Sequence, residues 1–405
     1  MLVWLAVVIP LIAVPVLYWR FSHKIALWEV LLQVGVPIIL VLCSKLLIEH
    51  CQVTDTEFWG GWVTHAEYYE DWDERVSCRH PRYETYTDSK GNTHSRFVGY
   101  EHMYDVDYHP SYWQMLDSNG LVISTSQTNF RRLTQQFGNN EFVDLHRSYH
   151  SNDGDKYVTT WPNNSETQEP VVTVHSYENR VQASNSIFNF QEVDPKANNL
   201  FEYPPVDGYN HQRVILGNGG PTMSVAEAWL QSCNAVLGTN KQAKIFVLVF
   251  TDREMQDAML QEAYWKRGNK NEFVICIGTD KQFNVQWGYV FSWTEVELLK
   301  IEVRNLIVEQ KELDLVKLAM QTFPLMEEKW QRKHFRDFAY LTIDPPTWAV
   351  ILVFIFTLLA SGGLSVWVVM NDLNPEPGSI KRFFRNIQCE MSYQWNRLTK
   401  KSRRW

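Results

Sequence analysis

The sequence predicts an α+β membrane protein with three transmembrane helices and a large extracytoplasmic region. Three observations predict it. Apolar runs occupy residues 2–18, 25–48 and 348–370; the stretch between the second and third runs is rich in strand and turn patterns; and Lys and Arg flank only some run ends. A helix needs roughly 20 apolar residues to cross ~30 Å of hydrocarbon, and the third run supplies them without a charged residue.

The first apolar run resembles a retained helix more than a cleaved signal peptide. A basic segment before it is missing, Pro10 and Pro15 interrupt it, and no cleavage site of small residues follows. We therefore expect residues 1–49 to form an N-terminal transmembrane hairpin.

Basic residues at the ends of the runs predict the orientation. Arg20 and Lys24 lie between the first two runs, and a basic tail follows the third. Such residues mark cytoplasmic loops, so the N-terminus and residues 50–345 are expected outside the cytoplasm and the C-terminus inside. The tail reads as an amphipathic helix on the anionic membrane surface, in preference to a protein-binding helix. Its basic residues are Lys381, Arg382, Arg385, Arg397, Lys400, Lys401, Arg403 and Arg404.

The charge distribution excludes one class of partner. The 405-residue chain has a formal net charge of -8. Residues 50–345 carry about 27 Lys and Arg against about 41 Asp and Glu, a net charge of about -14. Such a region repels phosphate backbones, so we expect no nucleic acid as a partner.

The region between the membrane segments divides into parts of different pattern. We expect a β-rich part at 50–187, a connector at 188–222 and an α/β part at 223–345, followed by a transmembrane helix at 346–371 and the tail at 372–405. In the β-rich part, turn sequences at 88–92 and 117–120 separate strand-like runs, and a short helix is expected at 128–137.

The α/β part alternates helices and strands. Strands are expected at 244–250, 273–278 and 285–293, the first two apolar on both faces, in an α/β sandwich. Ser224, Thr251 and Thr294 each precede a Glu by three residues and are predicted to cap helices. Gly238 is expected to end the first helix, and Pro324 to kink or break the third after residue 323.

The stretch 244–338, followed at once by an apolar helix, resembles the TPM domain family of membrane-anchored modules. The matching features are an apolar strand before a helix, the turn 268–271 leading into the strand 273–278, and Gly288-Tyr289 in the next strand. The resemblance implies that fold and, in some members, metal-dependent or phosphatase activity. The family's Gly-Tyr-Gly is Gly288-Tyr289-Val290 here, and its acidic residues have no clear counterparts beyond Asp280 or Glu295.

The whole chain also resembles uncharacterised membrane proteins encoded by tailed phages and bacteria. The resemblance rests on TDTEFWGGWV at 54–63, YHPSYW at 108–113 and NRVQASNSIFNF at 179–190. It implies an envelope setting and no mechanism.

One group of residues is a candidate metal site. Asp144, His146 and His150 combine a carboxylate with imidazoles four apart, and Asp153 and Asp155 lie in an oxygen-rich turn. The flanking residues favour a strand or turn, where that histidine spacing suits a metal less well, and the EF-hand's final Glu is missing. A structural or surface role is therefore the preferred interpretation.

The remaining residues favour binding over catalysis. The sequence contains no Gly-x-Ser-x-Gly elbow, catalytic-cysteine signature or phosphate loop. Cys43 is in a membrane segment and Cys389 in the tail, so four cysteines (Cys51, Cys78, Cys233 and Cys276) are expected in the outer region. Disulfides and free thiols both stay open for them, with Cys276 in an apolar strand. We expect an envelope protein that binds another protein or itself; the alternative is a metal-dependent, phosphatase-like hydrolase. The sequence indicates no particular cofactor.

Overall fold

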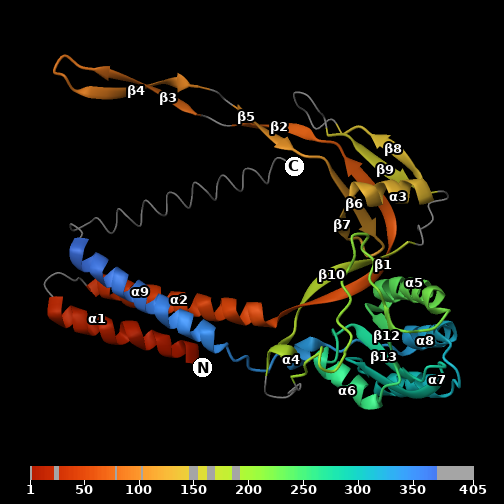
Figure 1. Ribbon diagram of the computed structural model, residues 1–405. Coiled ribbons are helices and arrows are strands. Elements are labelled where there is room, and N and C mark those ends of the chain that lie inside the picture. The colour runs from red at the N-terminus through yellow and green to blue at the C-terminus, as the bar shows by residue number, and fades with distance from the viewer. Residues whose placement is uncertain are drawn as a thin grey trace. The chain divides into compact units, whose positions relative to one another are not determined.

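The computed structural model is a mixed helix and sheet structure whose residues divide into two compact units (Figure 1). The first unit contains residues up to Thr54, the segment from Asn179 to Phe188, and residues from Tyr340 onward. The second contains Asp55–Glu178 and Asn189–Ala339. The structure describes residues 2–21, 27–77, 80–101, 104–145, 154–161, 169–184 and 192–371.

The first unit is helical. It contains η1 (Leu2–Val7), α1 (Val8–Phe21), α2 (Leu27–Val53), the short α4 (Arg180–Ala183) and α9 (Thr347–Asn371). Three of its segments are long and apolar enough to cross a membrane: Val3–Arg20, Glu29–Val53 and Thr347–Val368.

The three long helical segments pack against one another. Val3, Val41 and Val353 are buried in one small apolar cluster, and the Ser365 hydroxyl of α9 donates a hydrogen bond of 3.1 Å to Gln33 Oε1 of α2. Most of their remaining apolar side chains are exposed.

The first sheet of the second unit has six strands. The order is β7 (Val122–Thr125), β6 (Tyr112–Asp117), β1 (Thr54–Tyr69), β9 (Lys156–Thr160) and β8 (Asn139–Val143). A further strand, β10 (Pro170–Glu178), also pairs with β1.

Helix α3 (Gln127–Phe137) covers part of this sheet. Its buried Phe130 and Leu133 pack with Val63 and Met115. The Ser126 hydroxyl caps the helix by accepting a hydrogen bond of 3.1 Å from Asn129 N. The predicted short helix is therefore confirmed, with its cap in the preceding turn.

Two strand pairs form narrow ribbons outside this sheet. β2 (Trp72–Ser77) pairs with β5 (Tyr104–His109), and β3 (Pro81–Thr87) pairs with β4 (Thr93–Tyr100), both antiparallel (Figure 1). The predicted hairpin turn at 88–92 joins β3 to β4, with the Asp88 carboxylate accepting hydrogen bonds from backbone N–H groups of the turn. The other predicted turn, at 117–120, joins β6 to β7.

The second sheet has the order β11 (Ile215–Gly217), β12 (Lys244–Thr251), β13 (Glu272–Thr279) and β14 (Val285–Ser292). The first three strands are parallel and β14 is antiparallel. Every residue of β13 is buried, as the apolar pattern of the strand predicted. The predicted strands are confirmed, and β11 is an additional strand within the predicted connector.

Helices and a short 3-10 turn complete this part of the unit. Those packed with the sheet are α5 (Met223–Lys241), α6 (Met255–Tyr264), α7 (Glu297–Val308) and α8 (Leu315–Lys329). After them comes η3 (Phe335–Phe338).

The predicted caps in this part were wrong. α5 begins after Thr222 and α6 after Glu254, and neither residue makes a side-chain cap. α7 begins after Val296, also without a side-chain cap. Glu227, predicted to complete the first cap, instead accepts hydrogen bonds of 2.7 Å from Val214 N and Ile215 N. The backbone N–H groups at the start of β11 therefore take the Glu227 carboxylate away from the helix cap. No local sequence pattern reveals this contact.

The predicted helix end at Gly238 was wrong, and of the two predictions for Pro324 the structure contradicts the break. α5 continues past Gly238, and Gln242 supplies its left-handed end at φ 50°. The glycine at 238 has another role, since the missing Cβ lets the backbone of Gly60 approach. Pro324 lies inside α8, where Thr322 and Met326 are buried and hold both sides of the proline in the core. The break falls earlier, where Asp314 caps α8 by accepting a hydrogen bond from Lys317 N.

Candidate functional site

The predicted metal site lies only partly in the described structure. Asp155 Oδ1 accepts a hydrogen bond of 3.0 Å from Leu145 N, next to Asp144, so this carboxylate is bonded to the backbone. His146, His150 and Asp153 lie outside the described residues, as do all eight basic residues of the predicted membrane-surface tail. Within the described part of the chain, no three His, Cys, Asp or Glu residues form a group that could hold a metal ion.

The cysteines are free thiols wherever the structure describes them. Cys43 and Cys51 are exposed, and Cys233 and Cys276 are buried; Cys78 lies outside the described residues. The predicted buried thiol at Cys276 is confirmed, and burial raises the pKa of both buried thiols. A buried thiol with a raised pKa is a poor nucleophile, so these side chains serve packing.

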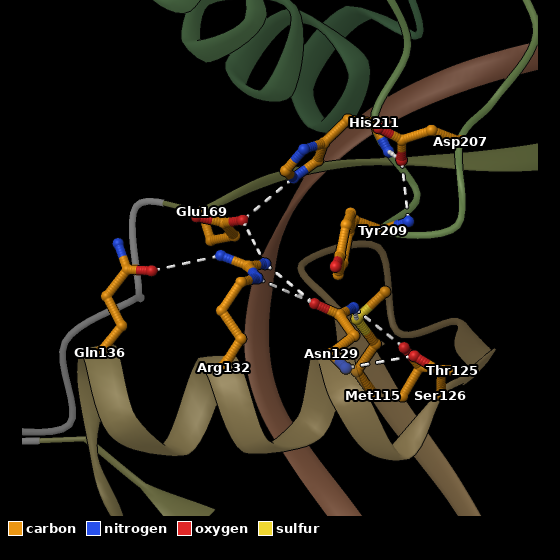
Figure 2. Close-up of polar contacts among 10 residues, drawn as sticks. All are labelled: Met115, Thr125, Ser126, Asn129, Arg132, Gln136, Glu169, Asp207, Tyr209 and His211. Carbon is orange, nitrogen blue, oxygen red and sulfur yellow. Dashed lines mark hydrogen bonds and ion pairs between the residues drawn. The ribbon is translucent and has the colours of Figure 1, made fainter.

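A polar cluster joins α3, the start of β10 and the loop at 207–211 (Figure 2). Arg132 Nη2 of α3 lies 2.6 Å from Glu169 Oε1, and His211 Nε2 lies 3.0 Å from the same oxygen. Arg132 also donates to Asn129 Oδ1 and lies 5.3 Å from the Tyr209 ring centre.

The contacts of the Glu169 cluster indicate a structural role and not a catalytic one. Burial acts to raise the pKa of Glu169, but the contacts from His211 and Arg132 outweigh it and leave the pKa below its ordinary value. Both partners contact the same oxygen, Glu169 Oε1, so this carboxylate links α3 to the loop at 207–211. The Ser126 hydroxyl nearby is already occupied as the helix cap.

A second charged cluster surrounds Glu57, near the start of β1. Arg332 donates to both carboxylate oxygens, and Lys270 Nζ lies 3.5 Å from Oε1. The Lys270 ammonium lies 4.2 Å from the Tyr177 ring centre. The side chain of Glu57 is only 3% exposed, so these two cations supply the compensation that a buried charge requires.

An aromatic pair extends this cluster. The ring of Trp59 stacks on His175 at 3.8 Å, and the Arg332 guanidinium lies 5.6 Å from the Trp59 ring centre. Burial lowers the pKa of His175, which keeps this imidazole uncharged beside the guanidinium.

A cavity of about 490 Å³ opens where β11 and β13 end. Gly220 and Phe283 line it, together with Gln310, whose side-chain nitrogen is buried without a hydrogen-bond partner in the described part of the chain. Lys311 and Lys317 are at its exposed rim with three carboxylates. Ligands of open α/β sheets bind at the carboxyl ends of the strands, so the cavity is a candidate small-molecule site. Because its rim carries both lysines and carboxylates, it does not select ligands of one charge.

The sequence interpretation missed this cavity. The segment 217–220 falls in the predicted connector, it contains no phosphate-loop motif, and the strand β11 that precedes it is only three residues long. Phe283 has φ 63°, a conformation that bulky residues rarely adopt, and only the structure reveals it.

The β3–β4 ribbon exposes aromatic side chains in the second unit. Tyr83 and Phe97 face each other across the ribbon, and Tyr86 faces His94. Tyr83 and Tyr86 are three residues apart in one strand, so the two pairs lie on opposite faces. Tyr83 is 60% and Tyr86 54% exposed, which leaves aromatic surface uncovered on both faces.

Comparisons with protein families, curated proteins and solved structures found no match to this chain.

Proposed function

We propose that this chain is a multi-pass membrane protein of a cell envelope whose extracytoplasmic region, residues 50–345, binds protein. The three apolar helical segments support membrane insertion, and the positions of Arg20, Lys24 and the basic tail support an outward N-terminus and an inward C-terminus. The proposal includes a TPM-like fold for residues 244–338, supported by the order of β12, α6, β13, β14 and α7 before a membrane helix.

The observation that carries the binding function is the β3–β4 ribbon. In the described structure its strands pair only with each other, and an isolated two-stranded ribbon gains little stability in water. Exposed aromatic side chains on both faces, as at Tyr83 and Tyr86, add a further cost unless a partner covers them. Aromatic residues are also the type that dominates protein interfaces.

The partner that we propose is a second copy of this chain. The ribbon carries Arg82, Lys90 and Arg96 against two carboxylates, whereas residues 50–345 as a whole carry a net charge of about -14. The acidic surface of another copy therefore attracts the ribbon. In α9, Gly362 and Gly363 have open space where a Cβ would lie, which leaves a small-residue surface for close helix approach.

Photo-crosslinking in native membranes tests this proposal. A photoreactive phenylalanine analogue replaces Tyr86 in the full-length chain, and the control carries it at Leu298 of α7, an equally exposed position. We expect a covalent dimer of this chain from position 86 and none from position 298. Capture of a different envelope protein at 86 would overturn self-association, and the absence of any crosslink would overturn the binding function.

A further inference from the structure

A lysine side chain is enclosed in the core of the second unit. Lys244, the first residue of β12, is 0% exposed, and its Nζ donates a hydrogen bond to Gln212 Oε1. Aromatic rings surround the amine, with the centre of Phe246 at 5.2 Å and that of Phe58 at 5.4 Å. Gln212 is itself 2% exposed, so water has little access to either group.

The surroundings of this amine do not suit an ammonium ion. Among the described residues, no carboxylate forms an ion pair with Lys244, and its only hydrogen-bond acceptor is the neutral amide of Gln212. Burial lowers the pKa of Lys244, and the charges of Glu272 and Glu227 act in the opposite direction without reversing it. A lowered pKa increases the share of uncharged amine, which is the nucleophilic form of a lysine side chain.

A proton-transfer pair lies beside the lysine and the glutamine. The Tyr203 hydroxyl donates a hydrogen bond of 2.5 Å to Glu272 Oε1 and also contacts the Gln212 side chain. Glu272 is 0% exposed and is the register partner of Lys244 in the neighbouring strand. Burial raises the pKa of Glu272, which brings this carboxyl closer to exchanging protons with an amine.

We propose that Lys244 and Gln212 are joined by an intramolecular isopeptide bond, formed by these core residues themselves. The Lys244 nitrogen attacks Gln212 Cδ, and a new N–C bond forms. One proton moves from that nitrogen, through Tyr203 and Glu272, to the Gln212 amide nitrogen. The C–N bond to that nitrogen then breaks, and ammonia leaves; no oxidant or other reactant is needed.

The fold supplies what such a reaction needs. It holds the amine and the amide in contact, which replaces an encounter in solution by a positioned one. It also encloses them away from water, so hydrolysis of the amide does not compete. The product contains no buried amine and ties β12 to the segment before β11, across a separation of 32 residues that contains α5.

Peptide mapping of the full-length protein, purified in detergent, tests the bond directly. Trypsin cuts after unmodified Lys244 and releases 242–244 and 245–253 as separate peptides. If the bond is present, the lysine is not cut, and 242–253 remains linked to the peptide 197–213, with the combined mass reduced by one ammonia. We expect the linked pair to account for most of the protein. Recovery of separate 242–244 and unlinked 197–213 as the main products overturns the proposal.

Variants test the roles of the residues. Lys244→Arg and Gln212→Leu, which remove the amine and the amide respectively, should contain no linked peptide. Glu272→Gln keeps the size of the side chain and should fold with the link lost or slowed at least tenfold. Lys270→Arg is the control. Lys270 is two residues before Glu272 in the sequence, but its ammonium contacts Glu57, so this variant should remain fully linked. A full link in Glu272→Gln would overturn the role of Glu272 without affecting the bond itself, which the native protein decides.

Discussion

Arg332 Nη2 lies 2.5 Å from Glu57 Oε2, although the two residues are separated by 275 positions in the sequence. The contact joins the start of β1, just after α2, to the segment that follows α8. Lys270, from the turn before β13, meets the same carboxylate. One buried acid thus connects three distant stretches of the second unit.

Loss of the Glu57 charge should destabilise the protein strongly. Glu57→Gln keeps the side-chain size but leaves Arg332 buried without its anion, and we expect a loss of about 3–5 kcal/mol in the free energy of unfolding. Denaturant unfolding in detergent, followed by tryptophan fluorescence, measures it. Arg332→Met combined with Glu57→Gln should lose less than the sum of the single changes. Additive losses would show that the two residues act independently.

Acidification should weaken the Glu169 cluster. The folded-state pKa of Glu169 lies below its ordinary value of 4.5, so its contribution is complete above that value and is lost as pH falls through the folded-state pKa. The melting temperature of the wild type should therefore fall more steeply than that of Glu169→Gln between pH ~5 and pH ~3. Parallel curves would contradict the assignment of Glu169 as the ionised partner of Arg132 and His211.

A methyl group at Gly238 should destabilise α5 despite the better helix propensity of alanine. Gly238→Ala gains about 1 kcal/mol in propensity, but the new Cβ would overlap the backbone of Gly60. We expect a net loss of about 1–3 kcal/mol, typical of an overpacked core. Ser232→Ala, at a half-buried position whose hydroxyl bonds Ala228 O of the same helix, is the control and should be neutral within about 0.5 kcal/mol. A stabilised Gly238→Ala protein would mean that β1 does not pack closely on this helix.

The ribbon aromatics should matter for binding and not for folding. Because Tyr83 and Tyr86 are exposed, their joint replacement by serine should change the free energy of unfolding by no more than about 0.5 kcal/mol. The same change should lower the dimer fraction in native membranes at least several-fold. Equal dimer fractions in the variant and the wild type would place the interface elsewhere.

The proposed orientation predicts which thiols an impermeant maleimide reaches. In a background without native cysteines, Lys90→Cys in the β3–β4 turn should react in intact spheroplasts. A chain that retains only Cys389 of the tail should react after lysis alone. Labelling of Cys389 in intact spheroplasts would reverse the proposed topology.

Local pattern was sufficient for elements that depend on their own residues. The turn at 88–92 and the strand β13 were predictable, because a side chain bonding its own turn and an uninterrupted apolar run both act over a few positions. Caps and helix ends were not. Glu227 bonds strand β11 and Gly238 meets Gly60, and such distant groups override a local preference.

The candidate clusters were largely hidden in the sequence. Glu57, Glu169 and Lys244 belong to no motif and look like ordinary charged residues of a large acidic region. The predicted metal group drew attention to histidines, but the clusters that the structure describes are built from carboxylates, cations and rings.

The sequence by itself determined that the chain has three helices suited to a membrane and a mixed helix and strand region between them. Hydrophobic length and strand or helix periodicity are local properties, and composition is sufficient to encode them. Only the tertiary structure brought Arg332 and Lys270 to Glu57, and Gln212 to Lys244. The pairing and packing of separate strands decide which charges share a buried site. In those low-dielectric surroundings each electrostatic contact is stronger than it is in water.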